Sequence, residues 1–168
     1  MNRRGALKAL AAALAVAPVR AASPSVSTLI GTGAPGESDR QVNNPYGLAL
    51  GPDGDLYFCD LDNQRIRRLD LQTHRTHVVA GNGEKAYAGD GGLAPHASLN
   101  MPHEIQFDSA GHLYIAERDN HVIRRVDRAT GVVSTVVGTG RAGFSGGRRG
   151  RPKPSADLRH WEPSPPAG

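Results

Sequence analysis

The stretch that decides the fold is a pair of matching segments, Asp-Asn-Gln-Arg-Ile-Arg-Arg-Leu-Asp at 62–70 and Asp-Asn-His-Val-Ile-Arg-Arg-Val-Asp at 119–127. The segments lie 57 residues apart, and the match extends without a gap over residues 44–83 and 101–140. Of the 40 aligned positions 14 are identical, several times the number that chance would give. Self-similarity at a fixed period is typical of repeat architectures.

Each unit has the pattern of four short strands separated by turns. Gly51-Pro52-Asp53-Gly54 places Pro and Gly where a β-turn needs them, and Asp62-Asn63 marks the next reversal of the chain. The strands expected in the first unit are residues 47–50, 56–60, 65–69 and 76–80, and those in the second are residues 105–107, 113–117, 122–126 and 132–137.

A third, partial copy precedes the two units. Residues 27–33, Ser-Thr-Leu-Ile-Gly-Thr-Gly, match residues 134–140, Ser-Thr-Val-Val-Gly-Thr-Gly. Because residues 134–137 belong to the last strand of the second unit, the match predicts a lone strand at residues 28–30.

Three hairpins in about forty residues make an up-and-down antiparallel sheet, and sheets with apolar inner strands need a neighbour on each side. The fold class predicted is therefore all-β, a partial β-propeller. It would hold two complete four-stranded blades and one strand of a third.

The motifs resemble the bacterial NHL repeat over residues 27–145. They are Pro-x-x-(Ile/Leu)-x-(Leu/Phe), Gly-x-Leu-Tyr, Asp-Asn-x-x-Ile-Arg-Arg-(Leu/Val)-Asp and Val-x-Gly-x-Gly, each present in both units. The resemblance implies a propeller of about six blades in the family. It also implies roles in binding protein, RNA or small ligands, and in some relatives metal-dependent lactone hydrolysis or lyase chemistry. Fold alone does not choose among these.

The N-terminal residues have the composition of an export signal. Residues 1–21 begin with a basic segment, continue with an apolar run at 9–17 and end in Val19-Arg20-Ala21, which suits a cleavage site. The segment Asn2 to Lys8 resembles a twin-arginine motif, although Ala6 stands where that motif prefers Phe, so the general secretory route stays open. The expected location is periplasmic or extracellular.

The C-terminal residues 146–168 differ in composition from the rest. After Gly146 the repeat requires Asp-Gly-Gly, as at Asp90-Gly91-Gly92, but the chain continues with Arg, Gly and Pro. We expect a disordered tail, either translated out of frame or a genuine basic extension. Two blades fall short of the three repeats that stacking needs. We therefore expect a product that is poorly folded, aggregation-prone at its exposed edges, or dependent on another chain to complete the propeller.

Tyr46, His103 and Glu104 are the candidate ligand-facing residues. They begin the first strand of their units, which is the innermost strand of a propeller blade, so they are expected at the mouth of the central channel. A His beside a Glu can bind metal or move protons. The competing interpretation is a set of polar residues at a wet rim, and no catalytic residue, metal or cofactor is assigned.

Other reactive side chains have structural explanations. Cys59 aligns with Ala116 and is expected to be a small buried filler, because one thiol cannot pair within its own chain. His74 sits at a turn and His77 at the edge of an outer strand, and both are expected to be solvated rather than metal ligands. Asp90 lacks the further carboxylates of a calcium loop and is expected to serve a turn.

The basic residues do not predict nucleic-acid binding. Residues 22–145 hold 11 Lys and Arg against 14 Asp and Glu, a net charge of −3, and neighbouring arginines on a strand point to opposite faces. The Arg67-Arg68 and Arg124-Arg125 pairs are therefore expected to form structural ion pairs. The partners expected for them are Asp62, Asp70, Asp119 and Asp127.

Two functions remain open, besides the possibility that the chain has no independent function. The first is an exported binding or scaffold module whose partner is a protein or a small molecule, without a membrane span. The alternative is a piece of a propeller enzyme, a metal-dependent lactonase, hydrolase or lyase.

Overall fold

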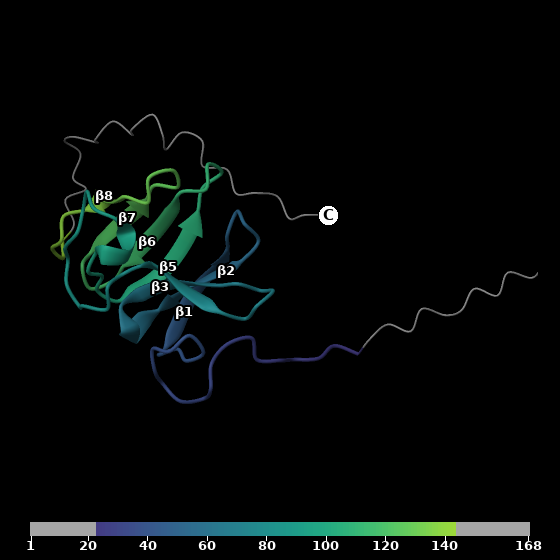
Figure 1. Cartoon of the computed structure of the whole chain (residues 1–168). Coiled ribbons are helices and arrows are strands. Elements are labelled where there is room, and N and C mark those ends of the chain that lie inside the picture. The colour runs from purple at the N-terminus through teal and green to yellow at the C-terminus, as the bar shows by residue number, and fades with distance from the viewer. Residues whose placement is uncertain (1–22, 144–168) are drawn as a thin grey trace, which may run out of the picture.

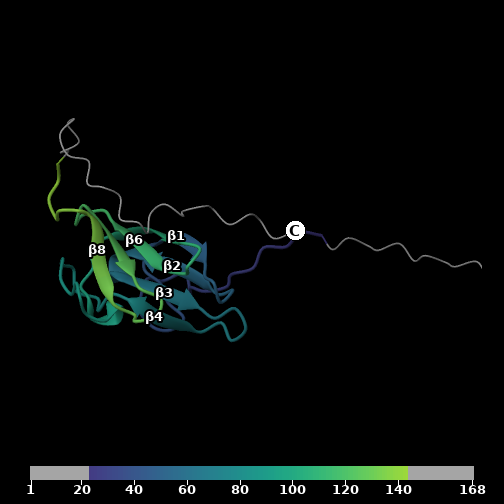
Figure 2. The same ribbon diagram turned by 90° about the horizontal axis from the view of Figure 1, so that it is seen from above.

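The computed structural model describes residues 23–143 as two four-stranded antiparallel sheets that lie against each other (Figures 1 and 2). Chain order equals strand order within each sheet. The first sheet holds β1 (Pro45–Leu50), β2 (Leu56–Asp60), β3 (Arg65–Leu69) and β4 (Thr76–Ala80). The second holds β5 (Pro102–Phe107), β6 (Leu113–Glu117), β7 (Val122–Val126) and β8 (Val133–Gly138). Two single-turn 3-10 helices, η1 (Leu61–Asn63) and η2 (Ala94–His96), complete the described part.

The backbone repeats with the period of the sequence. Asn44 and Met101 have φ of 54° and 53°, and Gln64 and His121, also 57 residues apart, have φ of 54° and 52°. Both sheets carry a bulge early in the first strand and another between the third and fourth strands. The predicted fold class is confirmed. Strand β1 begins two residues earlier than predicted, at Pro45, and β5 begins three residues earlier, at Pro102. A proline suits the first residue of an edge strand because it has no N–H to donate.

The lone strand predicted at residues 28–30 is wrong. The matching residues 135–137 lie in β8, which pairs with β7, whereas residues 28–30 have no neighbouring strand among the described residues. A β-strand is defined by its ladder, so the same local sequence stays irregular without a partner. The chain instead turns back just afterwards, and the Gly31 N–H donates to the Arg40 carbonyl at 3.2 Å.

The hydrophobic core lies between the two sheets. Cys59, Ile66 and Ala80 of the first sheet face Ile105 and Ile115 of the second, all almost completely buried. The segment that connects β4 to β5 adds Ala94, Ala97 and Leu99 to the same core. The contact between the first and second sheets is thus the main apolar interface of the described residues.

The two sheets approach each other closely at Gly47. A Cβ built on Gly47 would meet the His103 carbonyl oxygen at 2.5 Å and the Glu104 Cα at 2.8 Å. Both obstacles are backbone atoms of β5, so they cannot rotate away. Gly47 therefore sets how closely the edge strands β1 and β5 can pack.

The signal predicted for residues 1–21 and the tail predicted for residues 146–168 lie outside the described residues. Among residues 23–143 no helix has the length and apolar character needed to cross a membrane.

Gly47→Ala is expected to destabilise the protein by about 2 kcal/mol, because the new methyl group overpacks the contact with β5. Urea unfolding followed by circular dichroism measures the change. Gly143→Ala is the matched control, since its Cβ meets no heavy atom within 4 Å and the variant should unfold like the parent. Equal stability of both variants would contradict the close approach of β1 and β5.

Candidate functional site

The turn between the second and third strands of each sheet carries an acid–Asn–Arg triad. Its sequence is an acid, two residues, Asn, three residues and Arg. In the first sheet the triad is Asp60, Asn63 and Arg67, and in the second it is Glu117, Asn120 and Arg124. The acidic and arginine side chains of both triads are buried. Buried charges are tolerated where they are paired and hydrogen-bonded, so the surroundings of each triad matter.

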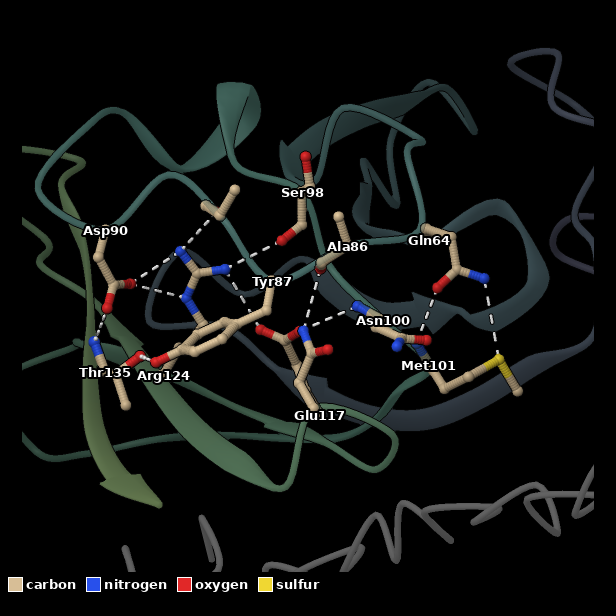
Figure 3. Close-up of polar contacts among 12 residues, drawn as sticks. Gln64, Ala86, Tyr87, Asp90, Ser98, Asn100, Met101, Glu117, Arg124 and Thr135 are labelled. Carbon is tan, nitrogen blue, oxygen red and sulfur yellow. Dashed lines mark hydrogen bonds and ion pairs between the residues drawn. The ribbon is translucent and has the colours of Figure 1, made fainter. Parts of the chain in front are cut away.

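Glu117 accepts three kinds of hydrogen bond (Figure 3). Its Oε2 accepts the Asn100 backbone N–H at 2.9 Å and the Asn120 side-chain amide at 2.6 Å, and its Oε1 lies 3.4 Å from Arg124 Nη1. Burial raises the pKa of the Glu117 carboxyl, while these hydrogen bonds and the charge of Arg124 act in the opposite direction. The carboxyl is fully engaged in holding residue 100, just before β5.

Arg124 uses its remaining donors to fix the segment between the sheets (Figure 3). It donates to the carbonyls of Ser98 at 3.1 Å and Ala88 at 3.0 Å, and its Nε donates to Asp90 Oδ1 at 2.9 Å. The other oxygen of Asp90 accepts the Thr135 N–H of β8 at 3.1 Å. Asp90 does lie in a turn, as predicted, and its carboxylate also joins that turn to the second sheet.

The first sheet repeats the arrangement on residues 36–43. Arg67 lies 3.0 Å from Asp60 Oδ2 and donates to the carbonyls of Gln41 at 2.6 Å and Ser38 at 2.7 Å, besides bonding the Thr76 hydroxyl. Asp60 accepts the Asn43 N–H at 2.7 Å, as Glu117 accepts that of Asn100. Each triad therefore holds the segment that leads into the first strand of its own sheet.

Gln64 connects the two sheets at the start of β5. Its Oε1 accepts the Met101 N–H at 2.7 Å, and its Nε2 lies 3.8 Å from the Met101 sulfur (Figure 3). Gln64 is buried, and both residues have left-handed backbones. This contact and the Glu117 contact to residue 100 position the residues that follow, including His103 and Glu104.

Tyr46, His103 and Glu104, here called the rim cluster, come together where the edge strands β1 and β5 meet. The Tyr46 and His103 ring centroids are 3.9 Å apart with an interplanar angle of 40°, and His103 Nδ1 lies 3.8 Å from Glu104 Oε1. Tyr46 and Glu104 are exposed, and His103 is half-buried. That these residues face a ligand stays a prediction.

A groove of about 480 Å³ lies at the opposite end of the sheets, between the hairpin turns. Tyr57 and Phe107 meet edge to face in its wall, with ring centroids 4.9 Å apart. Tyr57 donates to Asp53 at 2.9 Å, and burial together with this carboxylate raises the pKa of Tyr57 to about 12. The tyrosine is therefore a fixed, neutral part of the wall.

The remaining candidates occupy the places expected for them. Cys59 is buried, and burial followed by the charge of Glu104 raises the pKa of its thiol to about 12. His74 lies in the β3–β4 turn and His77 on β4, and both are exposed. No group of three His, Cys, Asp or Glu side chains suited to a metal occurs within residues 23–143.

The partners predicted for the arginine pairs are mostly wrong. Arg125 does pair with Asp127, at 3.3 Å, but Arg67 and Arg124 pair with Asp60 and Glu117 rather than with Asp62, Asp70 or Asp119. Arg68 lies 3.3 Å from Asp53 and 3.5 Å from Asp55. The correct partners could have been found from the acidic residue that recurs at positions 60 and 117. A comparison by identity overlooks it, because one residue is Asp and the other is Glu.

Arg124→Met is expected to cost about 3–5 kcal/mol, because it leaves Glu117 buried without its cation and frees three acceptors of the connecting segment. Arg125→Met is the matched control on the same strand, where a partly exposed pair contributes at most about 1 kcal/mol. Chemical denaturation of both variants gives the two values, and equal losses would contradict the special role of the triad.

Cys59 is expected to resist alkylation and disulfide exchange in the folded protein at mildly alkaline pH, because only the thiolate reacts and the thiol is buried with a raised pKa. The same reagent should label one thiol per chain once denaturant is added. Rapid labelling of the native protein would show that the core between the sheets is open.

Comparison with known proteins finds NHL-repeat sequences that are similar to this chain. A family model described as the teneurin NHL domain matches residues 69–146. The chloroplastic protein SUPPRESSOR OF QUENCHING 1 of Arabidopsis thaliana is 35% identical over 112 residues, 62% of this chain and 10% of that protein. Teneurin-3 of Mus musculus is 38% identical over 117 residues, 60% of this chain and 4% of its own length.

A solved gluconolactonase of Xanthomonas campestris covers 61% of this chain with a TM-score of 0.44 and 19% identity, and this chain covers 28% of it. That likeness bears on neither substrate nor chemistry. The chain matches only a small part of the length of its curated relatives. The sequence matches, together with the two four-stranded antiparallel sheets, support an NHL-repeat module with the fold of a partial β-propeller.

Proposed function

We propose that this chain is a binding module whose rim cluster contacts a segment of another protein. The observation that carries the proposal is the exposed Tyr46 ring against the half-buried His103 ring, beside the Glu104 carboxylate, at the edge where the two sheets meet. Exposed aromatic rings on a rigid scaffold are typical of recognition surfaces, since they offer contact area at a low entropic cost.

The other reactive groups support binding over catalysis. The buried carboxylates Asp60 and Glu117 are each paired with an arginine and an asparagine, so they hold the fold. Cys59 lies within the core with a thiol whose pKa is raised to about 12, which leaves it without nucleophilic character.

The rim cluster favours a ligand with a basic side chain next to an apolar one. The Glu104 carboxylate is exposed and can accept hydrogen bonds from a lysine or arginine. The Tyr46 ring is half exposed beside it, and its face attracts both cations and apolar groups.

Selection of a random displayed peptide library on the immobilised protein tests this proposal. We expect enriched peptides that carry Lys or Arg, and an affinity about tenfold weaker for Tyr46→Ala or Glu104→Gln when the peptides are titrated by calorimetry. His77→Ala, an exposed residue of β4, is the control and should bind like the parent. Enriched peptides whose affinity neither rim variant changes would contradict the site.

A propeller enzyme remains the second candidate because of one observation, the 3.8 Å approach of His103 to Glu104. Under the binding proposal, zinc titration should give the same affinity for the parent and for His103→Ala. A zinc affinity that this substitution abolishes would favour the enzyme.

A further inference from the structure

Each sheet has two faces that differ in what covers them. The face here called leading carries Leu48 and Leu50 in the first sheet and Ile105 and Phe107 in the second, at positions 57 residues apart. The opposite face, here called trailing, consists of residues that lie opposite one another on neighbouring strands. It carries Tyr57, Cys59, Ile66 and Ala80 in the first sheet and Tyr114, Ala116, Ile123 and Val137 in the second. Inside the chain, the trailing face of the first sheet packs on the leading face of the second.

The leading face of the first sheet is open at β1, whereas Phe58 and Leu69, on the same face of β2 and β3, are buried. Leu48 and Leu50 are 66% and 67% exposed, although Ile105, the counterpart of Leu48, is only 5% exposed. Phe107, the counterpart of Leu50, packs against the core and meets Tyr57 edge to face. The difference comes from the neighbour, because the positions on the strands are the same.

The trailing face of the second sheet is also exposed, although the equivalent face of the first sheet is buried. Val137 is 52% exposed, whereas Ala80 at the equivalent position is completely buried. Ile123 and Ala116 are partly exposed, and their counterparts Ile66 and Cys59 are fully buried. The chain thus presents both halves of an interface that it already forms once internally.

The two open faces match each other in chemistry. On the trailing side, Tyr114 and Ile123 repeat Tyr57 and Ile66 without change. On the leading side, Leu48 replaces Ile105 with a side chain of similar volume. Leu50 stands at the position of Phe107, which contacts Tyr57 edge to face. Volume-conserving apolar exchanges of this kind preserve packing.

We propose that copies of this chain associate head to tail, the trailing face of the second sheet of one copy packing on the leading face of the first sheet of the next. A second copy fits the open face, since it carries the same face that already covers the matching positions within the chain. An interface between two different faces of identical chains is heterologous and continues into a closed ring or a filament. The contact would also place Tyr46 of one copy beside His103 of the partner subunit, extending the rim cluster. The proposal is argued from the two faces alone and does not rest on the rim cluster binding a peptide.

The mass of the 168-residue chain in solution tests the association. Size-exclusion chromatography with light scattering should give a multiple of the 17.7 kDa chain, and Leu48→Asp/Leu50→Asp should give the monomer, because charges at the two sites cannot be desolvated against an apolar face. Val26→Asp, at a fully exposed site outside the strands, is the control and should associate like the parent. Circular dichroism verifies folding, since both leucines are exposed in the single chain. A folded parent that is monomeric at micromolar concentration overturns the proposal.

A mixing experiment separates this arrangement from a symmetric one. Val137→Asp should block only the trailing face and Leu48→Asp/Leu50→Asp only the leading face, so each variant alone should be monomeric. Mixed in equal amounts, they should form a 1:1 heterodimer through their one intact pair of faces, visible by native mass spectrometry. Absence of the heterodimer, with both variants folded, overturns the head-to-tail arrangement. Peptide binding by the rim cluster is measured separately, so the failure of one proposal leaves the other standing.

Discussion

The structure depends on a buried ion pair between an acid at the end of the second strand and an arginine on the third. In each sheet the acid also binds a backbone N–H just before the first strand, and the arginine binds carbonyls of the same incoming segment. Removing either partner would leave a charge in a region without water, so the arrangement is held as a unit. These hydrogen bonds fix the path of the irregular segment that precedes the first strand of each sheet.

The fixed path of the connecting segment determines how the sheets meet. Glu117 binds residue 100 and Gln64 binds residue 101, and β5 then runs alongside β1, where Gly47 permits close contact. The apolar faces then lie against each other, and the rim cluster forms at the junction without any direct ion pair of its own to the triads. Polar contacts thus set the geometry, and apolar burial supplies most of the stabilisation.

Repetition has a consequence for the exposed surface. A face that is buried inside the chain on one sheet is partly uncovered on the other sheet, since both sheets derive from one pattern. Contiguous apolar side chains at such a face mark an interaction surface in a folded protein. The rim cluster differs in kind, because its residues vary between the units, Tyr46-Gly47 in one and His103-Glu104 in the other.

The sequence by itself determined the strands, their order and the repeat, because turn residues and alternating apolar positions act locally and recur at a period of 57. It also placed Cys59 in the core through its alignment with Ala116. Only the tertiary structure decided the partners of Arg67 and Arg124 and the irregular path of residues 28–30. Those outcomes depend on groups brought together from distant segments, and local pattern carries no information on which of several nearby carboxylates an arginine will reach or whether a strand will find a neighbour.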